Sequence, residues 1–352
     1  MVQYGMAPVK RMVAPVGMRA IEVREYGAPE VMHLVVRPVP RAGPGEVVIQ
    51  AEAIGVNFHD LWARLGFPGL AALPFVQGIE VAGRVVDVGA GVEASLRGSR
   101  VIGLPLLTHG AYAECVKVAA DLAFPIPDEM PSDVAAAFAV NFCQALAALD
   151  FSARLRPGER VLIHAAAGGV GTAAVQLARR VGAEVFGTAS RSKHAYLRDL
   201  GVDHPIDYRT TDFAAEVQAL TRGEGVDVVL DPIGGESFRR SLALLRYGGR
   251  LVCYGISNFV RRSDQLGAQA ASFFESAAFP AADLLGGAKS VMGSHLGAPP
   301  ALLRAWMIEL LALYRSGAVA PRVDRVFPLA EAPAAHHYIH DRHNLGKVVL
   351  VP

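Results

Sequence analysis

The sequence has few cysteines, and they are not paired. Among its 352 residues there are three, Cys115, Cys143 and Cys253, and they lie far apart. A small disulfide framework needs an even number of closely spaced cysteines, and a four-cysteine zinc lobe needs paired spacing. The composition therefore argues against both, and we expect reduced thiols in a cytoplasmic protein.

An excess of charge of either sign is also missing. Lys and Arg total 34 and Asp and Glu total 33, so the formal net charge is +1. No basic stripe interleaved with aromatic residues is present, so nucleic acid is not expected as a partner. No apolar run reaches ~18 residues without a charge or a breaker, so no membrane span is expected. Residues 1–18 mix polar, apolar and breaker residues, which predicts a loose leader.

Hydrophobic residues make up 52% of the chain, and the length fits about two domains. Residues 19–125 hold short β-like runs broken by Gly and Pro, which predicts an antiparallel, partly barrelled β domain. From residue 160 onward, strand-like and helix-like segments alternate, which predicts a parallel sheet with helical crossovers. The expected strands span 160–164, 184–188, 203–206, 226–230, 249–254 and 290–294.

The tail has a helical pattern near 300–317 and 330–341 and a last strand at 347–351. We expect this tail to return to the first domain. The predicted division is therefore 19–140 with 296–352 for the β domain and 141–295 for the parallel-sheet domain. The Ala-rich stretch 265–287 predicts a helix or cap of undefined shape.

A glycine-rich turn follows the first strand of the parallel-sheet domain. Gly168, Gly169, Val170 and Gly171 open a helix-patterned stretch directly after an apolar run. Glycines there allow close backbone approach, and the helix amides and dipole attract an anion. Because this turn lies within strand–helix alternation, it predicts a pyrophosphate-binding site for a dinucleotide.

An acidic residue is missing at the end of the second predicted strand. An NAD site usually has Asp or Glu there to bind the ribose hydroxyls. This chain instead has Thr188, Ser190, Arg191 and Lys193 between residues 188 and 193. Hydroxyls and cations suit a 2′-phosphate, which a carboxylate would repel. The sequence therefore favours NADPH over NADH.

Several motifs together resemble one family. They are Ala-Ala-Ala-Gly-Gly-Val-Gly at 165–171, Gly-Ile-Glu-Val-Ala-Gly at 78–83, Val-Asn-Phe-His-Asp at 56–60 and the ending Asn-Leu-Gly-Lys-Val-Val-Leu-Val-Pro at 344–352. They resemble the zinc-independent medium-chain dehydrogenases/reductases, in the quinone oxidoreductase branch. Further stretches, at 186–190, 192–194, 204–213 and 226–235, are most similar to the vesicle amine transport protein homologues.

This resemblance implies a fold, an assembly and a site. The fold is a GroES-like β domain joined to a Rossmann domain, with the active cleft between them. The assembly is a homodimer joined through the edge strands of the Rossmann sheets. Asn57 is expected to face the nicotinamide and the substrate, with Lys193 and Tyr208 at the 2′-phosphate. The other residues expected near the cofactor are Gln144, Tyr254, Gly255, Ile256, Ser257 and Asn344.

Two residues argue against a catalytic zinc ion. Zinc-dependent relatives have Cys in place of Asn57 and His in place of Ile79. The Ile79 side chain cannot bind a metal, and an amide is a poor zinc ligand beside Cys or His. Without a Lewis acid, hydride addition to an already polarised C=C bond or quinone is easier than alcohol oxidation.

The chain also departs from the family pattern. Many relatives have a tyrosine about ten residues after the Asn, where this chain has Phe67 and a shorter loop. Trp62 and Phe67 are predicted to contact an apolar substrate. His59 is a candidate proton donor near neutral pH, although water is the alternative, and Asp60 is predicted to cap a helix or form an ion pair.

Histidines recur at helical spacing near the C-terminus, as His336, His340 and His343. Such spacing occurs in metal sites, but a solvated surface helix is the preferred interpretation. We therefore predict no metal site.

Three functions fit the sequence. The leading one is an NADPH-dependent reductase of quinones or activated C=C bonds. The second is a cofactor-binding scaffold or a protein with lipid or membrane partners and weak catalysis. The third is a tailoring reductase of secondary metabolism.

Overall fold

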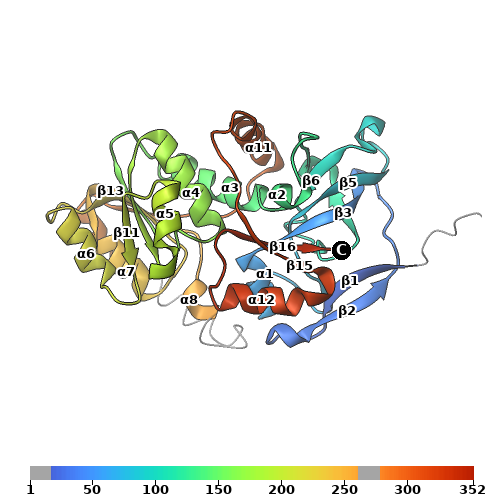
Figure 1. Cartoon of the computed structure of the whole chain (residues 1–352), viewed down its shortest axis with the longest axis horizontal. Helices are drawn as coiled ribbons and strands as arrows, with labels where there is room; N and C mark the ends of the chain where they lie inside the picture. The colour runs from blue at the N-terminus through green and yellow to red at the C-terminus, as the bar shows by residue number, and fades with distance from the viewer. Residues whose placement is uncertain (1–16, 261–277) are drawn as a thin grey trace, which may run out of the picture.

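The structure is a computed structural model that describes residues 17–260 and 278–352, and it consists of two domains (Figure 1). The predicted leader is therefore described only from residue 17 onward, and β1 already begins at Met18. Most of the predicted cap at 265–287 also lies outside the described residues, apart from helix α10 (Ala281–Leu285).

The first domain is built on antiparallel strands. Its larger sheet has the order β15-β16-β3-β5-β6-β8, with β7 also pairing with β3, and a smaller sheet has the order β2-β1-β4. The strands are β1 (Met18–Val23), β2 (Met32–Arg37), β3 (Glu46–Val56), β4 (Phe75–Val76), β5 (Val81–Val88), β6 (Arg100–Gly103), β7 (Cys115–Ala119), β8 (Ala123–Pro125), β15 (Val323–Pro328) and β16 (Lys347–Val351). Helices α1 (Phe58–Arg64), α2 (Ser132–Ala136) and α12 (Ala332–His340) belong to the same domain.

The second domain is built on a six-stranded parallel sheet with the order β11-β10-β9-β12-β13-β14. These strands are β9 (Arg160–Ile163), β10 (Glu184–Ala189), β11 (His204–Asp207), β12 (Val226–Asp231), β13 (Leu245–Cys253) and β14 (Ser290–Gly293). The helices are α3 (Ala139–Leu146), α4 (Gly169–Val181), α5 (His194–Leu200), α6 (Phe213–Leu220), α7 (Glu236–Ala243) and α8 (Ser257–Val260). In chain order the sheet reads 3-2-1-4-5-6, the dinucleotide-binding arrangement.

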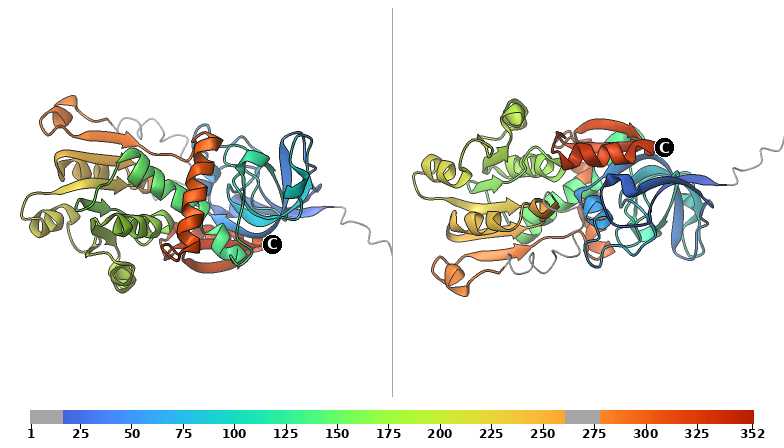
Figure 2. Two further views of the ribbon diagram at one scale, coloured as in Figure 1. Left: turned by 90° about the horizontal axis from the view of Figure 1, so that it is seen from above. Right: turned by 90° about the horizontal axis from the view of Figure 1, so that it is seen from below.

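Both faces of this sheet are buried, which explains the continuous apolar runs of its strands. On β9, Val161 and Ile163 join the core that holds α3 and α4. Leu162, between them, joins a separate core with Phe238 of α7. Helices accordingly lie on both sides of the sheet (Figure 2). The mixed α/β architecture predicted from the sequence, a GroES-like domain with a Rossmann domain, is confirmed.

The C-terminal segment makes contacts in both domains. Helix α11 (Pro300–Arg315) packs against α3, and β16 then pairs antiparallel with β3, with Val349 opposite Gly55. The backbone N–H of Gly346 donates to the carbonyl oxygen of Ala167 at 2.9 Å. The last strand therefore starts beside the glycine-rich turn of the other domain.

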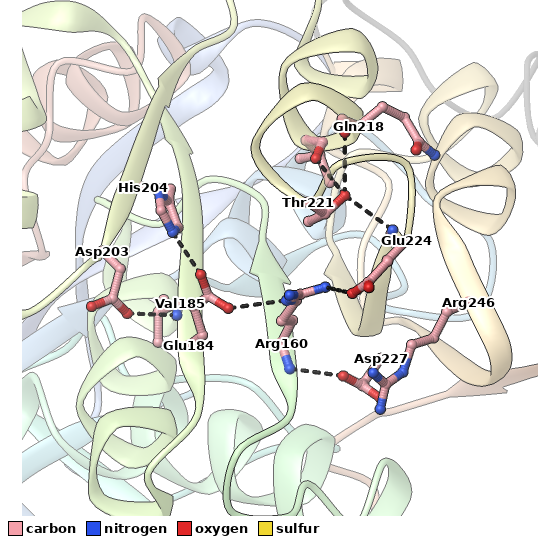
Figure 3. Close-up of polar contacts among 12 residues, drawn as sticks. Arg160, Glu184, Val185, Asp203, His204, Gln218, Thr221, Glu224, Asp227 and Arg246 are labelled. Atoms are coloured by element: carbon pink, nitrogen blue, oxygen red, sulfur yellow. Dashed lines mark hydrogen bonds and ion pairs between the residues drawn. The ribbon is translucent and has the colours of Figure 1, made fainter.

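Arg160 links neighbouring strands at the end of the parallel sheet where the strands begin (Figure 3). The Arg160 guanidinium bonds to Glu184 of β10 at 3.0 Å and to Glu224 at 2.6 Å, and its backbone N–H donates to Asp227 of β12 at 2.8 Å. These carboxylates lie at the amino ends of parallel strands, so the carboxyl ends remain available for a ligand.

Within the described parts of the chain, no helix has the length and apolar character needed to cross a membrane.

Candidate active site

A cavity of about 480 Å³ is lined by residues of both domains. The predicted site residues that line it are Asn57, His59, Trp62, Gln144, Gly168, Gly169, Val170, Gly171, Ser190, Lys193, Tyr208, Tyr254, Gly255, Ser257 and Asn344. Three further predicted residues, Phe67, Arg191 and Ile256, are not part of its wall. The sequence motifs are thus brought together although they come from both ends of the chain.

The glycine-rich turn needs glycine because protein atoms pack closely against it. A Cβ at Gly169 would lie 2.6 Å from Oδ1 of Asn141, and one at Gly171 would lie 2.3 Å from the carbonyl oxygen of Ala165. Gly168 is the N-cap of the thirteen-residue helix α4, whose first amides have no partner within the helix. The turn fits a pyrophosphate on backbone N–H groups.

A cation and a phenol lie at the carboxyl ends of β10 and β11. The Lys193 ammonium donates to the carbonyl oxygens of Arg342 at 2.9 Å and Asn344 at 2.5 Å, and it is half-buried. Burial raises the pKa of the Tyr208 hydroxyl, but hydrogen bonds and charges from Arg209 and Arg342 outweigh burial and lower that pKa overall. This positive surrounding suits a phosphate. Arg191, in contrast, is exposed and lies outside the cavity wall.

Two polar side chains of the cavity wall, Gln144 and Asn344, are fixed by hydrogen bonds. The Gln144 amide donates to the hydroxyl of Ser294 at 2.8 Å, so it links α3 to the residue after β14. The Asn344 amide donates to the carbonyl oxygen of Gly346 at 3.0 Å. These bonds fix both side chains along the path between the glycine-rich turn and Asn57.

At its other end the cavity meets a buried ion pair. Lys347 Nζ lies 2.5 Å from Oε2 of Glu80 and 2.6 Å from Oδ1 of Asn57, and the Lys347 and Glu80 side chains are 2% and 0% exposed. The Asn57 amide donates to Glu80 and to the carbonyl oxygen of Gly55, both at 3.2 Å. Both amide hydrogens of Asn57 thus have protein partners, which the sequence did not indicate.

A second polar network lies behind this pair, and it corrects one expectation. Asp60 caps α1, as predicted, by accepting from the backbone N–H of Asn57 at 2.8 Å, and it also accepts from the Tyr112 hydroxyl at 3.0 Å. His336 lies 3.1 Å from the same hydroxyl and accepts from Arg64 at 3.3 Å. His336 is fully buried. The prediction of a solvated helix face is therefore wrong for His336, because its ring packs against Arg64 of α1 and the Tyr112 ring as a hydrogen-bonded core residue.

Aromatic rings form the outer wall of the cavity. Trp62 lies edge-on to Phe58, with ring centroids 6.1 Å apart, and Phe67 lies behind it at 6.3 Å. The His59 ring is near Trp62 and stacks on His109 at 5.5 Å. Burial, followed by the charges of other histidines, lowers the pKa of His59 to about 4. The ring is therefore neutral at pH 7 and holds no imidazolium proton to donate there.

The residues present do not fit a zinc ion. At the two positions where zinc-dependent relatives have ligands, Ile79 is an alkyl side chain, and Asn57 has its oxygen bonded to Lys347. Over residues 17–260 and 278–352, no group of three His, Cys, Asp or Glu side chains is placed to hold a metal ion. The ammonium of Lys347 instead lies beside Asn57.

Comparison with known proteins places these features in context. Residues 43–128 match the family described as alcohol dehydrogenase GroES-like domain, and residues 200–350 match the family described as zinc-binding dehydrogenase. The chain is 39% identical to the synaptic vesicle membrane protein VAT-1 homolog of Rattus norvegicus over 343 residues, which are 95% of this chain and 84% of the relative.

Two solved structures show the same architecture. The quinone oxidoreductase of Escherichia coli, complexed with NADPH, aligns with a TM-score of 0.84 at 29% identity. The alignment covers 95% of this chain and 100% of the quinone oxidoreductase chain. The CurK enoyl reductase aligns with a TM-score of 0.80 at 32% identity, over 95% of this chain and 99% of that one. The chain therefore belongs to the zinc-independent medium-chain dehydrogenases/reductases, in the quinone oxidoreductase branch.

Proposed function

We propose that this protein is an NADPH-dependent reductase of quinones or of C=C bonds conjugated to a carbonyl group. The observation that carries the proposal is one continuous cavity with two chemically different ends. One end has the glycine-rich turn with Lys193 and Tyr208, and the other has apolar side chains around Asn57 and Lys347. A dinucleotide at the first end would reach toward an apolar substrate at the second.

The choice of NADPH rests on the residues at the end of β10. Ser190 and Lys193 lie where an NAD site usually has an acidic residue. The Lys193 ammonium is held in the cavity wall by two carbonyl oxygens. These groups attract a 2′-phosphate. When bound, NADPH would supply a hydride from C4 of its nicotinamide. The glycine-rich turn would bind the pyrophosphate, and Gln144, Tyr254 and Ser257 would line the path toward the ring.

The other end of the cavity suits an activated apolar acceptor. Ile79, Trp62 and Leu296 are apolar residues of the cavity wall, so a substrate bound against them would displace water. Removing water strengthens electrostatic stabilisation of a developing oxyanion. The two solved relatives are a quinone oxidoreductase and an enoyl reductase, and both substrate types contain a C=C bond polarised by a carbonyl group. We place the substrate of this chain in that class.

A second candidate function is a scaffold or membrane-associated protein with weak catalysis. Its support is the 39% identity to a protein named for synaptic vesicle membranes and the absence of Tyr at position 67.

We also propose a cytoplasmic homodimer that joins through edge strands of the Rossmann sheet. The edges of that sheet are β11 and β14.

An acceptor screen tests the reductase. NADPH oxidation would be followed with a quinone, an enone and an enoyl thioester, with NADH and an acceptor-free sample as controls. We expect acceptor-dependent oxidation of NADPH, and slower oxidation of NADH at equal concentration. Lipid vesicles would be tested for binding in parallel. Vesicle binding without any acceptor-dependent oxidation would favour the scaffold.

A further inference from the structure

We propose that the Lys347 ammonium is a catalytic electrophile that donates a hydrogen bond to the oxyanion forming on the substrate. This inference rests on the proposed function and deepens it, since it assigns the group that stabilises the developing charge. Asn57 would act as a positioning residue that holds the ammonium in place.

The hydrogen bonds of Asn57 explain why it is not the donor. Its amide nitrogen carries two hydrogens, and these point to the carbonyl oxygen of Gly55 and to Glu80. Its oxygen accepts from Lys347 at 2.6 Å. The side chain would have to break one of these bonds before it could donate to a substrate.

Lys347 has the capacity that Asn57 lacks. An ammonium carries three hydrogens, and among the described residues Lys347 Nζ has two acceptors, Glu80 and Asn57. One hydrogen is left for a further acceptor, and Lys347 is part of the cavity wall. Its backbone follows Gly346, which bonds to Ala167 at the glycine-rich turn. Because Lys347 and its partner Asn57 both line the cavity whose wall includes the glycine-rich turn, we place the ammonium near the point where cofactor and substrate would meet.

The charge balance supports the same role. Glu80 accepts from Lys347 and, through its other oxygen, from the backbone N–H of Val140 at 2.8 Å. The carboxylate and the ammonium balance each other, so the buried pair carries no net charge before substrate binds. When an anion forms, the ammonium is already in place and little reorganisation is needed.

The step balances with the proposed cofactor as the hydride donor. The hydride forms a new C–H bond at the β-carbon of an enone, and the π electrons of the C=C bond move toward the carbonyl oxygen. The third hydrogen of Lys347 bonds to that oxygen. The anion then takes one proton from water to give the saturated ketone, and the cofactor leaves oxidised.

The test compares Lys347→Met, Glu80→Gln and the double variant in the full chain. Lys347→Met is expected to lower kcat/KM for the best enone or quinone roughly 100-fold, while the NADPH dissociation constant changes less than threefold. Lys347→Arg should recover part of the loss. Lys117→Met is the matched control, because it removes an exposed Lys–Glu pair at 3.2 Å outside the cavity and should keep the wild-type rate.

The double variant separates catalysis from charge neutralisation. If Lys347 only balances Glu80, the double variant, which carries neither charge, recovers a rate near that of wild type, and that result overturns the proposal. If Lys347 is the electrophile, the double variant stays as slow as Lys347→Met. It also remains informative if Lys347→Met alone fails to fold, since no unpaired carboxylate is left in the core.

A second readout does not depend on turnover. The ionised form of 4-nitrophenol is coloured and resembles an oxyanion, so its binding with NADP⁺ can be followed by absorbance. Wild type should favour the bound phenolate roughly tenfold more than Lys347→Met does. Equal ionisation in both proteins contradicts the role of Lys347. A wild type that ionises the phenol but reduces no acceptor would instead contradict the proposed reductase.

Discussion

At the adenosine end of the cavity, Lys193 is the side chain on which cofactor choice most depends. We expect NADPH to bind at least tenfold more tightly than NADH, a difference of about 1.4 kcal/mol. Lys193→Ala should remove most of this preference, because the ammonium is held in the cavity wall by the carbonyl oxygens of Arg342 and Asn344. Titration calorimetry with both cofactors measures it.

Arg191 is the matched control for that experiment. It lies two residues away, carries the same charge and is exposed outside the cavity wall. Arg191→Ala should therefore keep most of the preference for NADPH. Equal affinities of wild type for NADPH and NADH would show that the missing acid at the end of β10 does not decide the cofactor.

His59 makes a prediction about pH. Its pKa of about 4 in the folded chain lies below the ordinary 6.5, so the unfolded chain binds more protons between these values. His59 therefore lowers stability as pH falls from 6.5 to 4, by about 3 kcal/mol in total, and has no such effect above 6.5. His59→Gln should remove that loss.

Denaturant unfolding of wild type and His59→Gln at pH 7 and pH 4 measures the difference. His33→Gln replaces an exposed histidine of β2 and is the control. A wild type and a His59→Gln variant that lose equal stability on acidification would show that His59 is not held in a neutral, buried state. Such a result would return His59 to the candidate proton donors.

At the scale of elements, the turn between β9 and α4 makes a prediction that opposes helix propensity. Gly→Ala in a helix normally stabilises by about 1 kcal/mol. At Gly171, however, the new Cβ would lie 2.3 Å from the carbonyl oxygen of Ala165. Gly171→Ala should therefore destabilise the chain by about 1–3 kcal/mol and weaken NADPH binding at least tenfold.

The control is Gly293→Ala in β14, where an added Cβ meets no atom within 4 Å. Thermal unfolding and cofactor titration of both variants give the comparison. If Gly171→Ala is as stable as wild type and binds NADPH equally well, the turn does not depend on close backbone approach.

Much of this element structure was predictable from the sequence. The parallel strands β9 to β14 appear as apolar runs because helices cover both faces of their sheet. The pairing of Lys347 with Asn57 was not predictable, since 290 positions separate these residues. The burial of His336 was missed for the same reason, because its partner Arg64 is 272 positions away. Local periodicity cannot report which distant side chains meet.

At the scale of the whole molecule, the two domains bring the glycine-rich turn and the apolar side chains near Asn57 into one cavity. The turn belongs to the parallel sheet, and the apolar end depends on the last strand, which crosses back to β3 (Figure 1). Gly346 links the two domains by its bond to Ala167. Both domains and the tail therefore contribute to the wall of the cavity.

The central claim is that a hydride passes from NADPH to an activated acceptor in this cavity. The most direct measurement uses NADPH deuterated at C4 on the transferred face, an enone acceptor and mass spectrometry of the product. The account predicts a reduced ketone that carries one deuterium at the β-carbon, formed by wild type and strongly reduced in Lys347→Met. A product without the label, or no product from any enone or quinone, would contradict it.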